Sequence, residues 1–220
     1  MALCQGALQE GWLQSSTPAI HNIIRKDPGM DDHPTRRSVV LGTLAACASV
    51  SSAAADDDDP RKEKRPQKGD LLVFSEGERE GQTITPADMK IGEPPIHAWP
   101  KDAANAIVRD GSRLNEVLLV RLDPNELDDD TRPRAAEGIV AYSAICSHAG
   151  CPVTAWIKAT EGNDDVMKCM CHNSEYDPRR GAQVVFGPAP RRLAALPLAI
   201  RDGALTVAAP FIGKVGGQQS

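Results

Sequence analysis

The sequence predicts an all-β fold built from antiparallel strands. From Asp70 onward, short apolar or alternating runs recur between turn residues, and each has the length and composition of a strand. The runs cover residues 71–74, 117–122, 139–142, 166–168, 183–186, 198–200 and 204–207. The dipeptide Asp202-Gly203 separates the last two runs and favours the positive φ angles of a tight hairpin turn. We therefore expect one antiparallel domain over residues 70–213.

Two segments of this domain carry other signals. Thr85 followed by Pro86 is typical of a helix start, so we predict one short helix there. The segment 92–100 contains three prolines, which lack a backbone N–H for a sheet ladder. We predict an ordered surface loop for this segment.

Composition and charge narrow the class of protein. The chain has 220 residues, enough for one domain plus an appendage, and 41% of them are hydrophobic. That fraction is low for one compact domain, so part of the chain is not core. The net charge of −5 argues against a nucleic-acid binder, which would present a basic surface.

The N-terminal part of the chain predicts an export signal. Residues 35–55 read TRRSVVLGTLAACASVSSAAA, which is an arginine pair, a modestly apolar run and a small-residue end. The pair resembles the twin-arginine export signal, which carries folded, cofactor-loaded proteins out of the cytoplasm. We assign this signal to residues 30–55, with retention as a membrane anchor left open, and expect translation to start at Met30. Residues 1–29 are then an over-extended gene model, and Cys47 stands in a lipoprotein-like processing box where lipid attachment is a further hypothesis.

Residues 56–69 predict a solvated tether. They read DDDDPRKEKRPQKG and contain no apolar side chain except proline, so they cannot bury much surface. Their five acidic and five basic charges cancel, and the charges of residues 1–55 also cancel. The whole −5 therefore belongs to the following domain, and residues 214–220 are expected to be a short tail.

Four of the six cysteines are concentrated in two short segments. These segments read CSHAGC at 146–151 and CMCHNSEYD at 169–177. Each offers a thiolate and an imidazole at close spacing, a set of two sulfurs and two nitrogens that suits tetrahedral zinc or an iron–sulfur cluster. The residue types alone leave both kinds of centre open.

Both segments resemble those of the Rieske iron–sulfur proteins. The resemblance extends over about residues 138–210 and includes Gly187–Pro190, which matches the proline loop of that family. It implies a Rieske-type antiparallel β-sandwich with a small cluster-binding subdomain. The loops of this subdomain would be 146–151, 169–177 and 187–190.

The resemblance also implies roles for individual residues. The ligands of a [2Fe-2S] cluster would be Cys146 and Cys169 on one iron, and His148 and His172 on the other. Cys151 and Cys171 match a disulfide that joins the two loops, which fits an oxidising compartment. The residues that tune the cluster would be Ser174, Tyr176, Gly150 and Pro188.

This ligand set predicts a high reduction potential. Neutral imidazoles in place of two thiolates make the cluster less negative, which raises the potential to between about −150 and +300 mV. Hydroxyl donors at Ser174 and Tyr176 favour the reduced state further, so we expect the upper part of this range. The second nitrogen of each histidine is left to face outward, where it can titrate or accept a hydrogen bond.

Four positions depart from the commonest family pattern. Asn173 stands where glycine is usual, Met170 where proline is usual and Ser147 where threonine is usual. Ala149 stands where leucine is usual, beside the histidines at which a quinol docks in the family. These differences concern the partner more than cluster binding.

Two hypotheses for function follow from the resemblance. In the first, the chain is the Rieske subunit that accepts electrons from quinol and passes them to a c-type cytochrome. In the second, it is the small Rieske subunit of a periplasmic molybdenum oxidoreductase such as arsenite oxidase. Either way it transfers electrons within a complex, is not catalytic alone, and is expected in the periplasm, associated with the membrane.

Two weaker alternatives have a different class of function. A cytosolic Rieske ferredoxin that serves an oxygenase usually lacks the second pair of cysteines and an export signal. The other, a substrate-free binding module, is the weakest hypothesis. A structural zinc site, the alternative for the same ligands, would leave the second cysteine of each segment and the spacing of Ser174 and Tyr176 unexplained.

Overall fold

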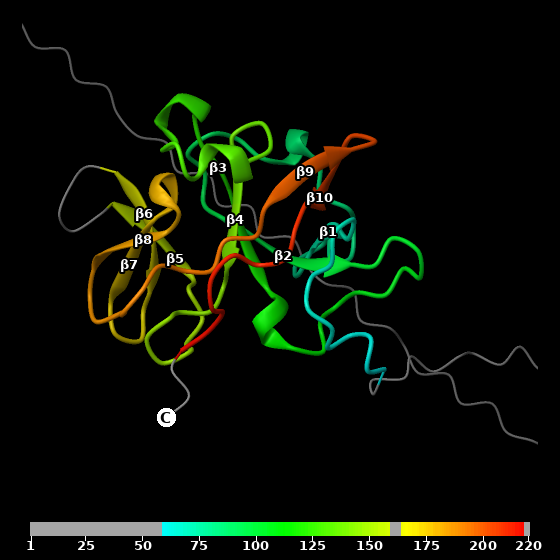
Figure 1. Ribbon diagram of the computed structural model, residues 1–220, viewed down its shortest axis with the longest axis horizontal. Coiled ribbons are helices and arrows are strands. Elements are labelled where there is room, and N and C mark those ends of the chain that lie inside the picture. Colours follow the sequence, from blue (N-terminus) through cyan, green and yellow to red (C-terminus); the bar gives the residue numbers. More distant parts are fainter. Residues whose placement is uncertain (1–58, 159–163, 218–220) are drawn as a thin grey trace, which may run out of the picture. The chain divides into compact units, whose positions relative to one another are not determined.

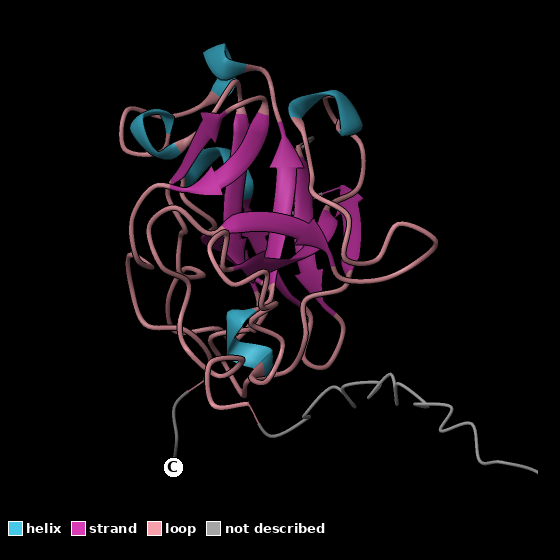
Figure 2. Cartoon of the chain, turned by 90° about the vertical axis from the view of Figure 1, so that its right-hand side faces the viewer, coloured by secondary structure: helices cyan, strands magenta, loops and turns pink. Residues whose placement is uncertain are grey.

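The computed structural model describes residues 59–158 and 164–217 (Figure 1). In these residues every strand pairing is antiparallel, and the helical segments are single short 3-10 turns (Figure 2). The predicted all-β antiparallel class is confirmed. The predicted export signal, the over-extended start and Cys47 lie outside the described residues.

The strands form two sheets. The six-stranded sheet has the order β4 (Ile139–Ser143), β3 (Val117–Arg121), β2 (Ile96–Lys101), β1 (Leu71–Phe74), β10 (Ala204–Val207) and β9 (Leu198–Arg201). The four-stranded sheet has the order β5 (Ala155–Lys158), β6 (Asp165–Cys169), β7 (Ser174–Asp177) and β8 (Gln183–Phe186). The smaller sheet is one continuous stretch of chain between β4 and β9.

Strands β3 and β4 lie between two hydrophobic cores. Leu118 and Tyr142 belong to a core shared with the four-stranded sheet, whereas Leu119 and Ala141 belong to the core of the six-stranded sheet. Because side chains alternate along a strand, a strand with apolar neighbours on both faces is apolar throughout. All five residues of β4 are buried for this reason. Figure 1 accordingly shows β3 and β4 between the β5–β8 sheet and the strands β1, β9 and β10.

The six-stranded sheet closes through the segment that precedes β9. The Ser143 amide donates to the Ala194 carbonyl at 2.8 Å, and the Leu196 amide donates to the Ala141 carbonyl at 2.9 Å. The edge strand β4 is therefore hydrogen-bonded on both sides. Paired edges protect a sheet against pairing with other chains, and here they also fix the base of the loop that follows β4.

Strand β2 corrects the predicted surface loop at 92–100. Residues 96–101 form a strand, and Pro100 is buried beside Leu72 of β1. The Arg109 amide donates to the Pro100 carbonyl at 2.8 Å, but proline has no N–H to return the bond. The side-chain amide of Asn115 donates to the Arg109 carbonyl at 3.1 Å instead. The proline is thus tolerated because another residue satisfies the carbonyl that it leaves open.

The predicted helix near Thr85 is confirmed as a 3-10 turn, η1 (Pro86–Asp88). The Thr85 amide donates to the Asp88 carboxylate at 2.8 Å, which caps the turn. Four further turns were not predicted: η2 (Arg113–Asn115), η3 (Pro124–Glu126), η4 (Arg132–Arg134) and η5 (Pro178–Arg180). The predicted hairpin at Asp202-Gly203 is present, with φ angles of 50° and 78°.

Residues 59–69 are fixed to the domain, which differs from the tether predicted at 56–69. The Asn115 side chain donates to the Lys64 carbonyl at 2.9 Å, and the Gly69 amide donates to the Val207 carbonyl at 2.8 Å. Directly after this segment, Asp70 forms a buried two-bond ion pair with Arg109, at 2.6 and 2.9 Å. The polar composition indicated solvation, but backbone carbonyls of this segment serve as acceptors for the domain.

The C-terminal part also departs from the predicted tail at 214–220. Residues 214–217 are described, and Gly216 is buried against Leu114 and Ile145. None of the described residues forms a helix that is long and apolar enough to cross a membrane.

Candidate metal centre

Three loops at one end of the four-stranded sheet hold the predicted site residues. The first loop, 146–151, follows β4, and the second, 170–173, joins β6 to β7. The third, 187–190, follows β8. Cys169 and Ser174 face each other across the β6–β7 ladder, so the second loop is a tight hairpin between them.

The first loop is buried and internally bonded. The Cys146 amide donates to the Cys151 carbonyl at 2.8 Å, and the Gly150 amide donates to the Cys146 carbonyl at 3.1 Å. Gly150 has φ of +73°, a conformation that other residues rarely adopt, which explains glycine at this position. The imidazole of His148 is held half-buried at the edge of the domain.

The second loop is exposed at its tip. Residues 170–173 are all exposed, and 58% of Met170 is accessible to solvent. Asn173 has φ of +60°, in the left-handed region. Asparagine tolerates this region better than other residues with a β-carbon. The structure therefore explains why asparagine can stand where the family usually has glycine.

The third loop covers the second through a close backbone contact. A β-carbon on Gly187 would lie 2.6 Å from the Ser174 Cα and 2.7 Å from the Asn173 carbonyl oxygen, so only glycine fits. The Ala189 amide donates to the Ser174 hydroxyl at 3.2 Å. Pro188, predicted to tune the site, is exposed next to this contact. Sequence reasoning missed Gly187 as an individual site residue, although it lies in the predicted proline loop.

The two predicted histidine ligands come together. The ring centroids of His148 and His172 are 4.6 Å apart, with an interplanar angle of 84°. The Nδ1 atom of His148 is buried and has no hydrogen-bond partner in the described residues. A buried polar atom without a partner is costly, so this nitrogen fits a metal ligand.

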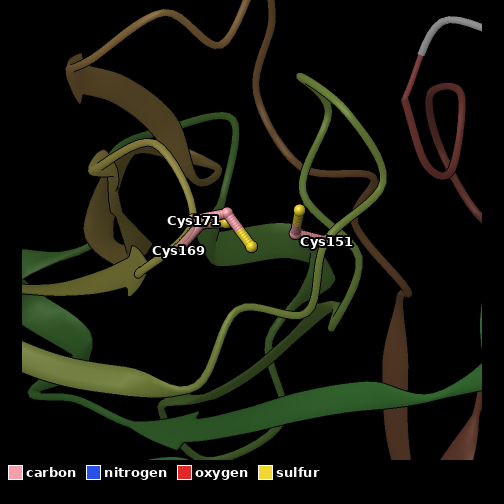
Figure 3. Close-up of side chains that lie close together, drawn as sticks. All are labelled: Cys151, Cys169 and Cys171. Carbon is pink, nitrogen blue, oxygen red and sulfur yellow. The ribbon is translucent and has the colours of Figure 1, made fainter.

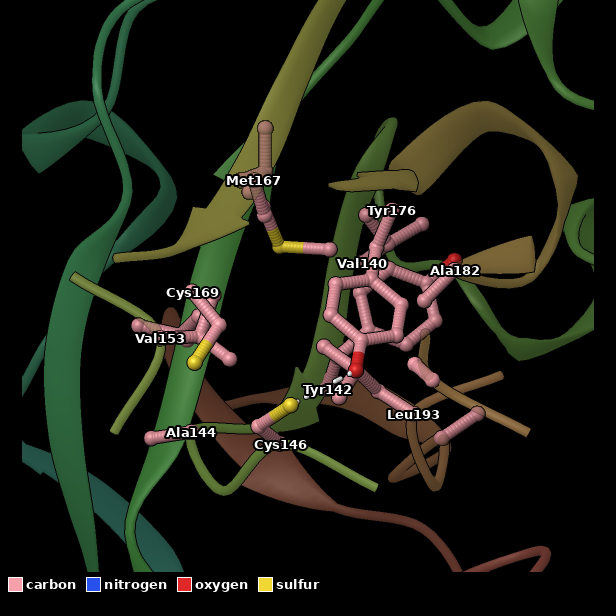
Figure 4. Packing of buried hydrophobic residues seen from close by; sticks show 14 of the residues in the cluster. Val140, Tyr142, Ala144, Cys146, Val153, Met167, Cys169, Tyr176, Ala182 and Leu193 are labelled. Carbon is pink, nitrogen blue, oxygen red and sulfur yellow. Dashed lines mark hydrogen bonds between the residues drawn. The ribbon is translucent and has the colours of Figure 1, made fainter. Parts of the chain in front are cut away.

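The predicted sulfur ligands, Cys146 and Cys169, lie in the hydrophobic core that the four-stranded sheet shares with β3 and β4. The hydroxyl of Tyr176 lies 3.0 Å from the Sγ atom of Cys146, and both residues are buried (Figure 4). Burial, together with the neighbouring Cys146 thiol, raises the pKa of the Cys169 thiol to about 12. Burial also raises the pKa of Tyr176, which therefore stays a neutral donor. A bound metal ion deprotonates such thiols because its own charge compensates the thiolate.

Three sulfur atoms form a second, overlapping group. The Sγ atoms of Cys151, Cys169 and Cys171 lie within 4.8 Å of one another, and Figure 3 shows Cys151 and Cys171 on two neighbouring loops. All the described cysteines carry free thiols. A hydrogen bond with Cys171 raises the pKa of the Cys151 thiol. The disulfide between Cys151 and Cys171 stays a prediction.

Comparison with protein families identifies the domain. Residues 115–197 match the model of the Rieske [2Fe-2S] domain. The Rieske iron–sulfur subunit of the cytochrome bc1 complex from Streptomyces lividans is 33% identical over 156 residues, which cover 68% of this chain and 85% of that relative. This chain belongs to the Rieske iron–sulfur protein family. It carries a [2Fe-2S] Rieske cluster and serves in electron transport.

A second relative has a different setting. The putative respiratory nitrate reductase subunit Rieske from Haloferax mediterranei is 30% identical over 217 residues, 97% of this chain and 91% of that relative. Other bc1-complex Rieske subunits are longer, and the match spans 24% to 41% of their lengths.

One solved structure that matches part of this chain is also a Rieske protein. The soluble domain of Rieske protein II from Sulfolobus acidocaldarius is 21% identical, with a TM-score of 0.34. The match covers 48% of this chain and 68% of that domain.

Proposed function

We propose that Cys146 and Cys169 bind one iron of the cluster and that His148 and His172 bind the other. The unpartnered Nδ1 of His148, which lies in ring contact with His172, carries this assignment. The competing set of Cys151, Cys169 and Cys171 contains no histidine, whereas Rieske clusters take two. Cys169 belongs to both sets because Cys151 and Cys171 lie next to the proposed centre.

We propose that Cys151 and Cys171 form the disulfide that joins the first and second loops. Their sulfurs lie within 4.8 Å of each other, and this closeness and the hydrogen bond between them support the pairing. Such a bond persists only in an oxidising compartment. Mass measurement of the intact oxidised chain, before and after reduction, is expected to differ by two hydrogen atoms per molecule. An unchanged mass would contradict the pairing.

The chain's own residues prepare the site for coupled electron and proton transfer. When bound, the cluster supplies a one-electron carrier of high potential. His172 is exposed, so its outer nitrogen can accept a hydrogen bond from a donor that docks at the loop tip. Tyr176 directs its hydroxyl at the Cys146 sulfur and favours the more negative state.

The donor and acceptor are part of the same proposal: electrons come from quinol and pass to a c-type cytochrome. Similarity to the bc1-complex subunit over 68% of this chain supports it. The exposed apolar side chain of Met170 beside His172 supports a lipid-soluble donor, because it offers apolar contact next to a hydrogen-bond acceptor.

The test is isolation of the full chain, with an affinity tag, from solubilised membranes of its host. A c-type cytochrome is expected to co-purify, and added quinol should reduce it. The matched control is a tagged His172→Ala chain, which should lack quinol-dependent reduction. Isolation without a cytochrome, or reduction that is independent of His172, would overturn this proposal.

A second candidate is a Rieske subunit attached to a large molybdenum oxidoreductase. The putative nitrate reductase subunit aligns with 97% of this chain at 30% identity, which favours a partner outside the bc1 complex. The same isolation distinguishes the two, since a large molybdenum-containing subunit would replace the cytochrome in the purified complex.

The place of action is a proposal as well: the periplasm, at the membrane surface, after twin-arginine export. The arginine pair in residues 35–55 supports it. Replacement of Arg36 and Arg37 by lysine is expected to leave the chain in the cytoplasm, which cell fractionation measures. Unchanged export of that variant would contradict the assigned signal.

A further inference from the structure

Arg191 connects three segments around the first cluster-binding loop. Its backbone carbonyl, directly after the third loop, accepts a hydrogen bond from the Ser147 hydroxyl. Its guanidinium donates through Nη2 to the carbonyl of Gly216 in the C-terminal segment. Ser147 stands between the proposed ligands Cys146 and His148, so Arg191 is linked to the centre of the ligand loop.

The C-terminal segment lies directly against the backbone of that loop. A β-carbon on Gly217 would lie 2.7 Å from the Gly150 nitrogen and 2.8 Å from the His148 carbonyl oxygen. At Gly216 it would lie 3.7 Å from the Ile145 side chain, just before the loop. Two successive glycines allow this approach, and a larger residue at Gly217 would push the two backbones apart.

The start of this segment is anchored independently. Ala195 and Ile212 exchange two backbone hydrogen bonds, of 3.0 and 2.8 Å. Residues 213–217 thus run from a fixed point in the six-stranded sheet to the first loop. The contact at Gly217 is therefore held at one end by the sheet and at the other by Arg191.

Arg191 carries a positive charge on a partly buried side chain. Its Nε atom is buried and has no hydrogen-bond partner in the described parts of the chain. No carboxylate within residues 59–158 and 164–217 forms an ion pair with it. Burial of an uncompensated charge is costly, so a nearby group that becomes negative would be stabilised by it.

We propose that Arg191 and residues 213–217 form a clasp that positions the first loop and raises the reduction potential of the cluster held there. Arg191 is a positioning residue in this proposal, because its carbonyl holds Ser147 and its guanidinium holds Gly216, and its charge acts in the same direction. The proposal rests on the ligand set proposed above. One added electron makes the cluster more negative, and a partly buried cation favours that state with little screening by salt.

The experiment is a redox titration of the holoprotein with chemical mediators, followed by electron paramagnetic resonance. Arg191→Met is expected to lower the one-electron reduction equilibrium constant at least threefold, which is about 28 mV. The shift should remain when salt is raised to about 1 M, where the screening length falls to about 3 Å.

Arg113→Met is the matched control. Arg113 is exposed, and its Nη2 atom lies 3.6 Å from the position of a β-carbon on Gly150, so its charge is also near the first loop. Any shift that this variant causes at low salt should vanish at high salt, since the charge is in solvent. A shift in Arg191→Met that vanishes in the same way would overturn the proposal.

Gly217→Ala tests the clasp without a change of charge, and decides the matter if Arg191→Met does not fold. Its β-carbon should displace the segment and lower the equilibrium constant in the same direction. Combined with Arg191→Met, it should add less than its separate effect, because both act on one contact. An unchanged potential in Gly217→Ala would overturn the clasp.

These outcomes are separate from the ligand proposal. A wild-type protein without a Rieske-type resonance signal would contradict the ligand set. A normal wild-type signal, with variants that titrate like the wild type, would contradict the clasp alone.

Discussion

The first and second cluster-binding loops contribute the same kinds of ligand but are held in opposite ways. Cys146 and Ser147 of the first loop are almost inaccessible, whereas residues 170–173 of the second are exposed. The first loop has hydrogen bonds to the proline loop and contact with the C-terminal segment. Among the described residues, the second loop is fixed at its base by Ser174 and the Gly187 contact, and its exposed tip touches the first loop at Cys151 and His148.

Because of this difference, the first loop holds its metal ligands in place and the second gives a partner access to the site. A rigid ligand loop keeps the metal geometry constant when charge changes, since the surrounding groups need not reorganise. The exposed loop presents His172 to a partner. The first loop is therefore packed like core residues, and the tip of the second loop is exposed to a partner.

The largest expected effect is loss of the cluster from either loop. Cys146→Ala and His172→Ala should each remove the [2Fe-2S] cluster, which iron content and visible spectra measure. Without the cluster, Cys146→Ala should lower the free energy of unfolding by about 1–2 kcal/mol, because it removes a buried sulfur beside Tyr176. His172→Ala should leave it unchanged, because His172 is exposed. Equal destabilisation by the two variants would contradict the comparison.

A substitution in the third loop tests how the second loop is held. Gly187→Ala should lower the free energy of unfolding by about 3 kcal/mol, because its β-carbon meets the backbone of Asn173 and Ser174. Gly203→Ala is the control, with a similar φ of +78° and no atom within 4 Å. Its cost should be about 1 kcal/mol, from backbone strain alone. Chemical denaturation measures both, and equal costs would remove the argument for close contact.

A smaller effect concerns the hydroxyl beneath the first loop. Tyr176→Phe should keep the cluster and lower its reduction potential by about 60 mV, which corresponds to one hydrogen bond of about 1.4 kcal/mol to a charged group. Tyr142→Phe is the control, because its buried hydroxyl donates to the Pro178 carbonyl at 2.7 Å and not to sulfur. It should destabilise the fold and leave the potential unchanged. A shift in both variants would mean that the hydroxyl of Tyr176 has no specific role.

The smallest expected effect concerns the strand base of the first loop. His97 contacts Glu116 at 2.7 Å, and the Glu116 carbonyl accepts from the Ala144 amide just before the loop. The bond to Glu116 raises the pKa of His97, and the charge of Glu76 adds to it. A raised pKa gives stability that is complete below the unfolded value of about 6.5 and is lost as pH rises through the folded value.

His97→Gln should therefore cost about 0.5–1 kcal/mol at about pH 5.5 and less at about pH 9. Thermal melts across this range measure it. Glu116→Gln should likewise lower the free energy of unfolding more at about pH 5.5 than at about pH 9, because it removes the partner of His97. A cost that grows with pH would reverse the sign and contradict the assignment.

Much of the fold could be predicted from local patterns. The β1 run at 71–74 and the β8 run at 183–186 match the observed strands in full, since alternation and β-branched residues signal strands directly. β2 and β7 could not be predicted, because β2 contains Pro100 and two of the four residues of β7 are acidic. Pro100 is accepted only because Asn115 satisfies the open carbonyl, and the Glu175 side chain is buried in an ion pair with Lys168 at 3.1 Å.

The candidate site shows the same division. The residue types and spacing of two segments were sufficient to predict a metal centre, because metal coordination depends on few atoms with strict chemistry. The resemblance to the Rieske proteins narrowed this prediction to a [2Fe-2S] cluster. The closeness of Gly187 to Ser174, and of Gly217 to Gly150, had no such signal. Contacts between segments far apart in sequence leave no local periodicity, and a glycine alone does not show what lies against it.

The sequence by itself determined the class of the fold and, through its resemblance to the Rieske proteins, the cofactor, because these depend on strand-length patterns and ligand chemistry. The ligand set stays a prediction. Only the tertiary structure decided which loop is buried, and that residues 59–69 and 214–217 pack on the domain. It also decided that Arg191 meets the ligand loop. The physical reason is that burial and close approach depend on all neighbours together, whereas a pattern records only neighbours along the chain.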